Sequence, residues 1–237
     1  IFCLAVAAGG RPGALDIGPP LAGPQPVDPV WLRIGFLLAL VGFGTKMGLA
    51  PMHAWLPDTH SEAPAPVSAL LSGAVLNTAL LGLLRVYHVC AQHGQAVFAG
   101  QWLVVFGLLS LGVAAVLMYG EGDFKRLLAL SSVENMGIIA VGVGLGAGGA
   151  YSSLLHTLHN TLNKGIVFFL AGFFSHVFAT TRIADIRGVL ARAPVAGVLL
   201  TAGLCAVCAL PPFGTFFSEF GIIVATAQAG RWVVLVL

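Results

Sequence analysis

The chain has 237 residues, of which 58% are hydrophobic and only 8% are charged, and its mean hydropathy is +0.96. Charged residues make up about a quarter of an ordinary soluble domain, so this composition excludes a soluble enzyme, a disordered tail and a coiled coil. It indicates a polytopic membrane protein. The net charge of +2 is too small and too scattered for a nucleic-acid-binding surface, and four cysteines form no disulfide framework.

Apolar runs of about 20 residues, long enough to cross a membrane, follow one another along the chain. Residues 1–8 resemble the end of one such helix, and a Pro/Gly-rich loop follows up to residue 29. Full spans are expected at about 30–50, 65–88, 98–119, 127–147, 151–178 and 195–228, and another begins near residue 232. Backbone groups inside a bilayer must bond internally, so the sequence predicts an all-α polytopic membrane bundle.

The ends of the sequence suggest that it is a piece of a longer protein. It begins with Ile1 instead of Met and ends inside the apolar run 232–237. We therefore expect residues 1–29 to be the end of a truncated transmembrane helix plus a loop. Residues 30–237 are expected to be a fragment of one membrane domain with about six full spans.

Two of these spans contain helix-breaking residues. The first is interrupted at 48–51, where Pro57, Pro64 and Pro66 prolong the irregular stretch, and the last is interrupted at Pro211 and Pro212. Proline removes a backbone donor and collides with the preceding turn. Paired broken helices point to a transport site built from repeats, although an ordinary proline kink is the alternative at either place.

Alternating the spans across the membrane places three connections, near 58, 121–126 and 181–192, on one side. That side carries five Lys or Arg residues and the other side carries four: Lys125, Arg126, Arg182, Arg187 and Arg192 against Arg11, Arg33, Arg85 and Arg231. The excess weakly favours a cytoplasmic location for the first side.

Four ionisable residues fall inside the predicted spans: Lys46, Glu134, Lys164 and Glu219. A lysine at a helix centre costs ~2.5–3.5 kcal/mol, so these side chains are expected to face the bundle interior. Burial disfavours the charged form of both amines and carboxylates, which brings such groups closer to titration near neutral pH. They are candidates for passing protons, and buried Lys–Glu pairs that only lock helices together are the structural alternative.

A polar stripe surrounds one of these lysines. His156, Asn160 and Lys164 are spaced by four residues, so on a helix they line one side over ~12 Å. The spacing predicts a proton relay, whereas His159 and Asn163 point elsewhere. A satisfied helix–helix hydrogen bond is the alternative for His156.

Several apparent motifs lack the context that their chemistry needs. Cys205 and Cys208 have C-x-x-C spacing, but they lie within a membrane span. The glycines of 144–149 follow no strand, so they predict tight packing or a helix stop instead of a nucleotide site. No His or Cys set suits a metal, a haem or an iron–sulfur cluster, so no cofactor is predicted.

Four segments together resemble the antiporter-like, proton-conducting membrane subunits of respiratory complex I and its relatives. Within that family the chain looks most like the hydrogenase-4 component F type, from the membrane arm of group 4 nickel–iron hydrogenases. The likeness runs from about residue 30 to 230. The matching segments are Gly44-Thr-Lys46-Met-Gly-Leu-Ala-Pro51-Met-His53-Ala-Trp55-Leu-Pro57-Asp58 with Glu62-Ala-Pro64, Asp123-Phe-Lys125-Arg126-Leu-Leu-Ala-Leu-Ser131-Ser132-Val-Glu134-Asn-Met-Gly137, Asn163-Lys164-Gly165, and Pro211-Pro212-Phe213-Gly214 with Phe217-Ser218-Glu219-Phe220.

The resemblance implies two inverted five-helix repeats, each with a broken helix and half of a proton path. It assigns Lys46 to the lysine of the first broken helix, Lys164 to the central lysine, His156 to its relay histidine and Glu219 to the exit-side group. The glutamate that tunes the first lysine would lie upstream of Ile1. The chain departs from the family at Asn160, where some relatives have histidine. It also departs in the span 65–88, where several relatives carry a Lys or His.

In that span the notable interior polar residues are Ser72 and Asn77, which with Asn160 could hold water. The sequence therefore predicts a proton-translocating subunit of a redox-driven complex, in which Lys46, His156, Lys164, Glu219 and Glu134 form the relay. Its expected partners are other membrane subunits, a peripheral hydrogenase or dehydrogenase arm, lipid and protons, and its expected location is the cell's inner (plasma) membrane. A subunit of an Mrp-type cation/proton antiporter and a non-pumping hydrogenase anchor remain as alternatives.

Overall fold

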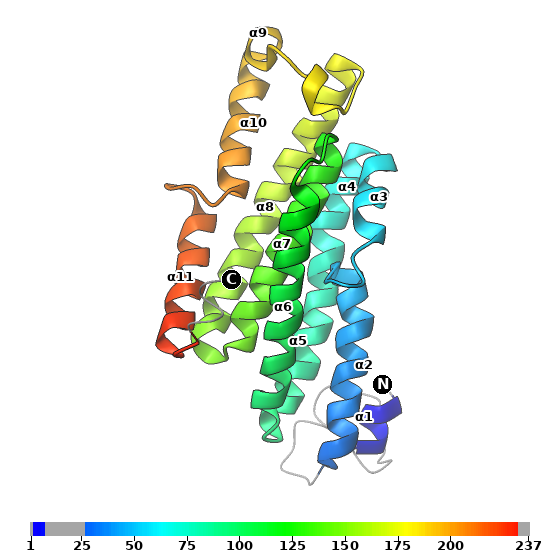
Figure 1. The fold of residues 1–237 in the computed structure, drawn as a ribbon, viewed down its shortest axis with the longest axis vertical. Coiled ribbons are helices and arrows are strands. Elements are labelled where there is room, and N and C mark those ends of the chain that lie inside the picture. Colours follow the sequence, from blue (N-terminus) through cyan, green and yellow to red (C-terminus); the bar gives the residue numbers. More distant parts are fainter. Residues whose placement is uncertain (1, 8–26, 232–237) are drawn as a thin grey trace.

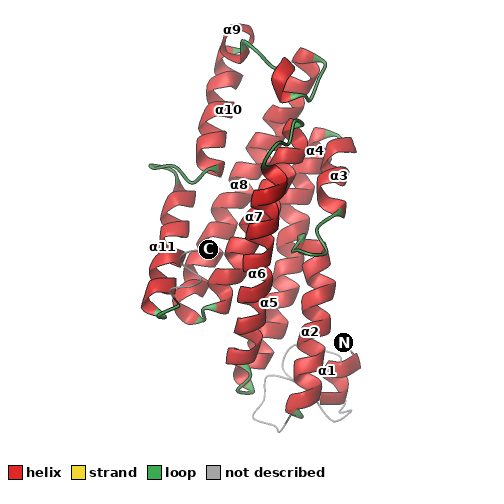
Figure 2. Cartoon of the chain, in the orientation of Figure 1, coloured by secondary structure: helices red, strands yellow, loops and turns green. Residues whose placement is uncertain are grey.

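The computed structural model describes residues 2–7 and 27–231, and within these residues every regular element is a helix (Figures 1 and 2). The elements are α1 (Phe2–Ala7), α2 (Pro29–Met47), α3 (Trp55–Glu62), α4 (Ala65–Leu70), the π-helical turn η1 (Leu71–Val75), α5 (Leu76–Gln92), α6 (Ala96–Met118), α7 (Phe124–Gly144), α8 (Ala147–Phe178), the 3-10 turn η2 (Ile183–Asp185), α9 (Val189–Arg192), α10 (Pro194–Val207) and α11 (Gly214–Gln228). The all-α prediction is confirmed. The expected span near residue 232 and most of the expected first loop lie outside the described residues.

Five helical segments among the described residues are long and apolar enough to cross a membrane. One of them is continuous from α4 through η1 to α5 (Ala65–Gln92), and the other four are α2, α6, α7 and α8. They coincide with the first five expected spans to within a few residues. The sixth expected span, 195–228, is divided into α10 and α11, so it is a broken helix as the two prolines predict. The chain is a multi-pass membrane protein.

Helix α7 is the centre of the bundle. In its most apolar stretch 83% of the residues are buried, compared with 28–39% in the other four segments. Figure 1 shows α7 in the middle of the molecule, with α2 and α3 along one edge and α10 and α11 along the opposite edge. Side chains on α7 are therefore placed to meet groups from both broken segments.

The first break is shorter than the sequence predicts. Helix α2 ends at Gly48, whose φ of 76° is the left-handed conformation that glycine adopts without strain. The chain then resumes as α3 at Trp55, although the expected irregular stretch ran on through Pro57 and Pro64. Pro57 lies in the first turn of α3, where the amide hydrogen that proline lacks would have no helical partner. The Trp55 indole donates to the Thr45 carbonyl at 2.7 Å, which ties the two helices together.

The second break has side-chain support of its own. Helix α10 ends at Val207, and Ala209 adopts a φ of 48° before Pro211 and Pro212. The Thr215 hydroxyl on α11 donates to the Ala206 carbonyl at 2.6 Å, which satisfies one of the last carbonyl groups of α10. The break therefore divides the span into two helices, α10 and α11, which the hydrogen bond from Thr215 to Ala206 holds together.

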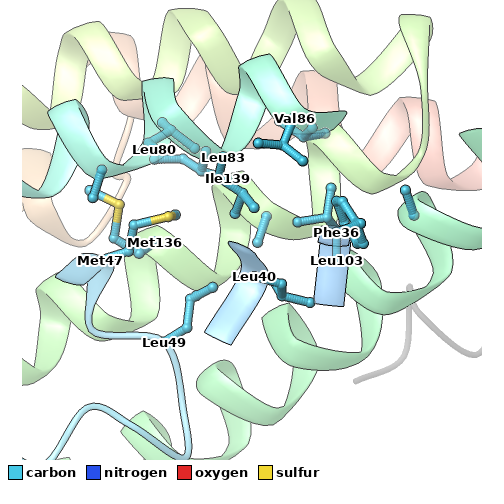
Figure 3. Close-up of a cluster of buried hydrophobic side chains, with 14 of the residues drawn as sticks. Phe36, Leu40, Met47, Leu49, Leu80, Leu83, Val86, Leu103, Met136 and Ile139 are labelled. Carbon is cyan, nitrogen blue, oxygen red and sulfur yellow. The ribbon is translucent and has the colours of Figure 1, made fainter. Parts of the chain in front are cut away.

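Two apolar clusters hold the helices in place. The larger cluster joins α2, α5, α6 and α7 through side chains such as Phe36, Leu83, Leu103 and Ile139 (Figure 3). The smaller cluster joins α4, α7, α8 and α10 and includes Phe168. Both clusters include residues of α7, so packing fixes its position relative to α5 on one side and α8 on the other.

Three connections meet at one end of the bundle, as the threading of spans predicts. Arg126 lies 3.4 Å from Asp58 and 3.3 Å from Glu121 in ion pairs that link α3 to the turn before α7. The side chain of Asp123 accepts hydrogen bonds from the Arg126 backbone and from the Thr181 hydroxyl, which ties that turn to the segment after α8. The start of α7, the first turn of α3 and the segment after α8 are thus held together.

Candidate functional site: a polar string between α7, α8 and α11

A series of polar contacts runs through the interior between α7, α8 and α11. It begins at Lys164, whose side chain is fully buried on α8. The Lys164 ammonium donates to the Leu128 carbonyl at 2.9 Å and to the Ser131 hydroxyl, both on α7. A cation without solvent is tolerated only where its donors find acceptors, and α7 supplies two of them.

The next member of the string is Asn135, one turn along α7 from Ser131. Its side-chain amide donates to the Ser131 backbone carbonyl, which leaves its Oδ1 atom as an acceptor. That oxygen lies 2.8 Å from Nε2 of His156, a fully buried residue of α8. Because Oδ1 can only accept, Nε2 of His156 carries a hydrogen.

His156 can be satisfied in both of its protonation states. Its Nδ1 atom lies 3.0 Å from the Ser218 hydroxyl on α11. When the imidazole is neutral, Ser218 donates to Nδ1. When the imidazole is charged, Nδ1 donates to Ser218, whose hydroxyl then turns to the Thr215 carbonyl at 2.9 Å. A histidine that keeps its hydrogen bonds after gaining a proton suits a relay.

Two carboxylates stand beside this string. Glu219, half-buried on α11, places its Oε1 atom 4.0 Å from Nε2 of His156. Glu134, half-buried on α7, interacts electrostatically with both Lys164 and Glu219. The structure thus brings together four of the five expected relay residues, namely Glu134, His156, Lys164 and Glu219.

The expected water-holding residues fall into two groups. Asn160 is buried on α8 between His156 and Lys164, and its side-chain Nδ2 has no hydrogen-bond partner, so the amide can bind a water there. Ser72 and Asn77 also bond to the protein, but the Asn77 Oδ1 atom has no hydrogen-bond partner and can accept from a water in the same way. Ser72, in the π-helical turn η1, lies 3.0 Å from the Ser132 hydroxyl, and Asn77 donates to Thr161 at 2.6 Å. π-Helical turns occur often at functional sites.

Lys46 is not part of this string. It lies in the last turn of α2, and its side chain is exposed among the described residues. A cation is favourable at a helix C-terminus because of the helix dipole. The described residues therefore do not place Lys46 next to Lys164, and a role for Lys46 in the relay stays a prediction.

Three members of the string were not among the residues expected from the sequence: Ser131, Asn135 and Ser218. His60, on α3 in the connection expected near residue 58, is a further buried polar residue. His159 and Asn163 point away from the string, as expected, and line a separate cavity of about 300 Å³ beside α10 and α11.

The weaker motifs have structural roles. Helix α7 ends at Gly144, and a Cβ atom there would lie 2.6 Å from the Gly100 carbonyl oxygen, so this glycine permits close helix packing and the helix stop that the sequence predicts. Cys205 and Cys208 are free thiols at the end of α10. Within residues 2–7 and 27–231 no three His, Cys, Asp or Glu side chains are grouped as ligands for a metal ion.

Comparison with known proteins identifies the family. Residues 27–237 match the family described as NADH:quinone oxidoreductase/Mrp antiporter, TM. The chain belongs to this antiporter family. One relative, the hydrogenase-4 component F homolog of Methylacidiphilum infernorum, is 43% identical over 198 residues, which are 83% of this chain and 42% of the relative. NADH-quinone oxidoreductase subunit N of Desulforudis audaxviator is 34% identical over 89% of this chain and 42% of its own length.

A solved structure shows the same antiporter-family fold. A chain of the membrane-bound sulfane sulfur reductase, an archaeal respiratory membrane complex, superposes with a TM-score of 0.90 at 25% identity, covering 100% of this chain and 48% of that chain. The expected family and its antiporter-like fold are therefore confirmed. The chain spans less than half the length of these relatives.

Proposed function

We propose that this chain contributes part of a proton path to a redox-driven membrane complex. In this path Lys164, His156 and Glu219 take up and release protons in turn, and Glu134 adjusts the charge around them. The chain itself carries no electrons; oxidation and reduction take place in partner subunits.

The observation that carries the proposal is the series of polar contacts from Lys164 to the Ser131 hydroxyl, from the Ser131 carbonyl to Asn135, and on through His156 to Ser218. Glu219 lies 4.0 Å from His156. Charged groups in a membrane interior are costly, so those that are present mark functional sites. This series joins the central helix α7 to the second broken helix, so a proton that leaves Lys164 has a polar route to a carboxylate at α11.

The names of the relatives support a redox-driven complex. They include a hydrogenase-4 component and an NADH-quinone oxidoreductase subunit. We infer that a peripheral hydrogenase or dehydrogenase arm and other membrane subunits are the partners, and that the membrane is the cell's inner (plasma) membrane. Lys46 would belong to a second, separate proton site at the first break.

Substitution of Glu219 by glutamine tests the proposal in the complete complex. Glu219→Gln keeps the shape of the side chain and removes its ability to take up a proton. We expect redox-driven proton movement into proteoliposomes to be lost, while the complex assembles normally. Asp185→Asn, the same chemical change at an exposed position in η2, should leave proton movement unchanged.

Other outcomes separate the alternatives. If the Glu219→Gln complex moves protons at the wild-type rate, the relay is wrong. If the wild-type complex moves no protons but supports its redox reaction, the chain is a membrane anchor. Exchange of Na⁺ for H⁺ without any redox reaction would instead identify a subunit of an Mrp-type antiporter.

A further inference from the structure

A buried histidine lies apart from the polar string. His60, on α3 between the spans that end at Met47 and begin at Ala65, is 0% exposed. Neither of its ring nitrogens has a hydrogen-bond partner, while its backbone carbonyl accepts from the Ser68 hydroxyl at 3.4 Å. Buried polar atoms in folded proteins nearly always find partners. Two unpaired ring nitrogens therefore call for an explanation in terms of a proton or a water that they bind.

The imidazole ring is held in a fixed place by an aromatic contact. It stacks on Phe168 of α8, with ring centroids 4.6 Å apart and ring planes 12° from parallel. Phe168 follows Lys164 by four residues, so the two side chains lie on the same side of α8, about 6 Å apart along its axis. His60 is thus one helical turn beyond Lys164, on the end of the bundle where the three connections meet.

A cavity lies one further turn along α8. It has a volume of about 510 Å³, and its lining includes Glu62, Lys125, Gly172 and His176. Gly172 follows Phe168 by four residues, which places the cavity on the same side of the helix. The order along α8 is therefore Lys164, then the pair of Phe168 and His60, then the cavity.

We propose that His60 delivers protons from this cavity to Lys164. In the step, an N–H bond of the His60 imidazolium breaks and an N–H bond forms on the neutral Lys164 amine, with water between the two groups because neither ring nitrogen bonds to the protein. The positive charge moves from the ring to the amine, and the neutral ring then takes up a proton from a hydronium ion that enters by way of the cavity. This inference rests on the proposed function of Lys164 and adds the group that reloads it.

The charge on Lys164 affects how readily His60 binds a proton. Two cations act on the ring, Lys164 from α8 and Lys125 from α7, while Ser68 of α4 is neutral. Burial lowers the pKa of His60 to about 4, and the two lysine charges act in the same direction. When Lys164 has given up its proton, one of the two repelling charges is gone and the ring binds a proton more readily. Proton binding at His60 is thus favoured when Lys164 is neutral and opposed when Lys164 is charged.

The test uses the complete complex in proteoliposomes and three variants. His60→Phe keeps a stacked ring and removes both nitrogens, and His60→Gly opens a space that free imidazole can enter. His88→Phe makes the same change at an exposed histidine on α5. We expect His60→Phe and His60→Gly to slow redox-driven proton movement at least about tenfold. Imidazole added at about 10 mM should restore a large part of the rate only in His60→Gly. His88→Phe should behave as wild type.

The outcomes distinguish this proposal from the proposed function. If Glu219→Gln stops proton movement while His60→Phe leaves it at the wild-type rate, the relay stands and the role of His60 is wrong. If His60→Gly is slow and imidazole does not restore it, His60 only packs against Phe168, and the proposal is also wrong. If neither Glu219→Gln nor His60→Phe changes proton movement, the proposed function itself fails.

Discussion

The Oε1 atom of Glu219 lies 4.0 Å from Nε2 of His156, across the interface between α11 and α8. The same Nε2 atom is 2.8 Å from the Asn135 side-chain oxygen on α7. One imidazole therefore links the central helix to the second broken helix. Because an N–H···O bond needs a separation of about 3 Å, the Glu219 carboxylate would have to move toward His156 by about 1 Å to replace the Asn135 amide as its partner.

The Asn135 bridge should be essential for proton movement. Asn135→Leu removes the acceptor for the Nε2 hydrogen of His156, and an unpaired buried donor costs about 1–3 kcal/mol. We expect a lower melting temperature and at least a tenfold slower redox-driven proton movement. Thr201→Val is the control, because the Thr201 hydroxyl bonds only to the Gly197 carbonyl of its own helix. Equal proton movement in the two variants would contradict the bridge.

Lys164 should separate stability from function. Lys164→Met keeps most of the side-chain volume and removes a buried charge, so we expect stability that is unchanged or higher together with complete loss of proton movement. Lys164→Ala leaves a cavity and should cost about 2–5 kcal/mol. Melting temperatures of the detergent-solubilised complex and proton movement in proteoliposomes measure the two effects. A Lys164→Met complex that pumps would remove Lys164 from the path.

The sequence predicted the helices and both breaks because these depend on local properties. Apolar runs determine where a chain can cross a membrane, and proline interrupts a helix wherever it stands beyond the first turn. Pro57 was expected to prolong the break, but it lies in the first turn of α3, where a proline is tolerated. Whether a proline breaks a helix therefore depends on where that helix begins. The start at Trp55 depends on its bond to Thr45 across the break, which no local pattern reveals.

The site was predicted only in part, for a different reason. Ionisable residues in a membrane are recognisable by their cost, so Lys164, Glu134 and Glu219 could be singled out. Asn135 and Ser131 could not, because a small polar residue in a span can equally well bond to its own helix, as Thr201 does. His60 lies in a stretch that is polar in sequence, and it is buried by packing against other helices, which includes its stacking on Phe168 of α8.

The contact between α6 and α7 should tolerate no side chain at Gly100. A Cβ atom there would lie 2.6 Å from the Gly144 carbonyl oxygen, a backbone atom that cannot move alone. Gly100→Ala should therefore lower the melting temperature. Gly112→Ala on the same helix meets nothing within 4 Å, and it should raise stability by up to about 1 kcal/mol because alanine favours a helix. A thermal shift of the same sign in both variants would contradict the close approach.

Burial of His60 should make the protein less stable in mild acid. The pKa of this group falls from 6.5 to about 4 on folding, chiefly because of burial. Above pH 6.5 the imidazole is neutral in both states and contributes no pH dependence. Between pH 6.5 and 4 the unfolded chain binds a proton that the folded chain excludes, so the free energy of unfolding decreases as the pH falls, by about 3 kcal/mol in all. Below pH 4 both states are protonated and the effect levels off.

A comparison of two variants isolates this contribution from the other titrating groups. The melting temperature of the solubilised protein is measured from pH 7.5 to about pH 4.5 for wild type and for His60→Phe, a range that spans most of the expected loss. We expect the two curves to diverge below pH 6.5, with wild type losing stability faster. His88→Phe should follow wild type, because it changes an exposed side chain on α5 and leaves His60 in place. Parallel curves for wild type and His60→Phe would show that folding does not disfavour the charged ring, and the dependence of His60 on the Lys164 charge would then lose its electrostatic basis.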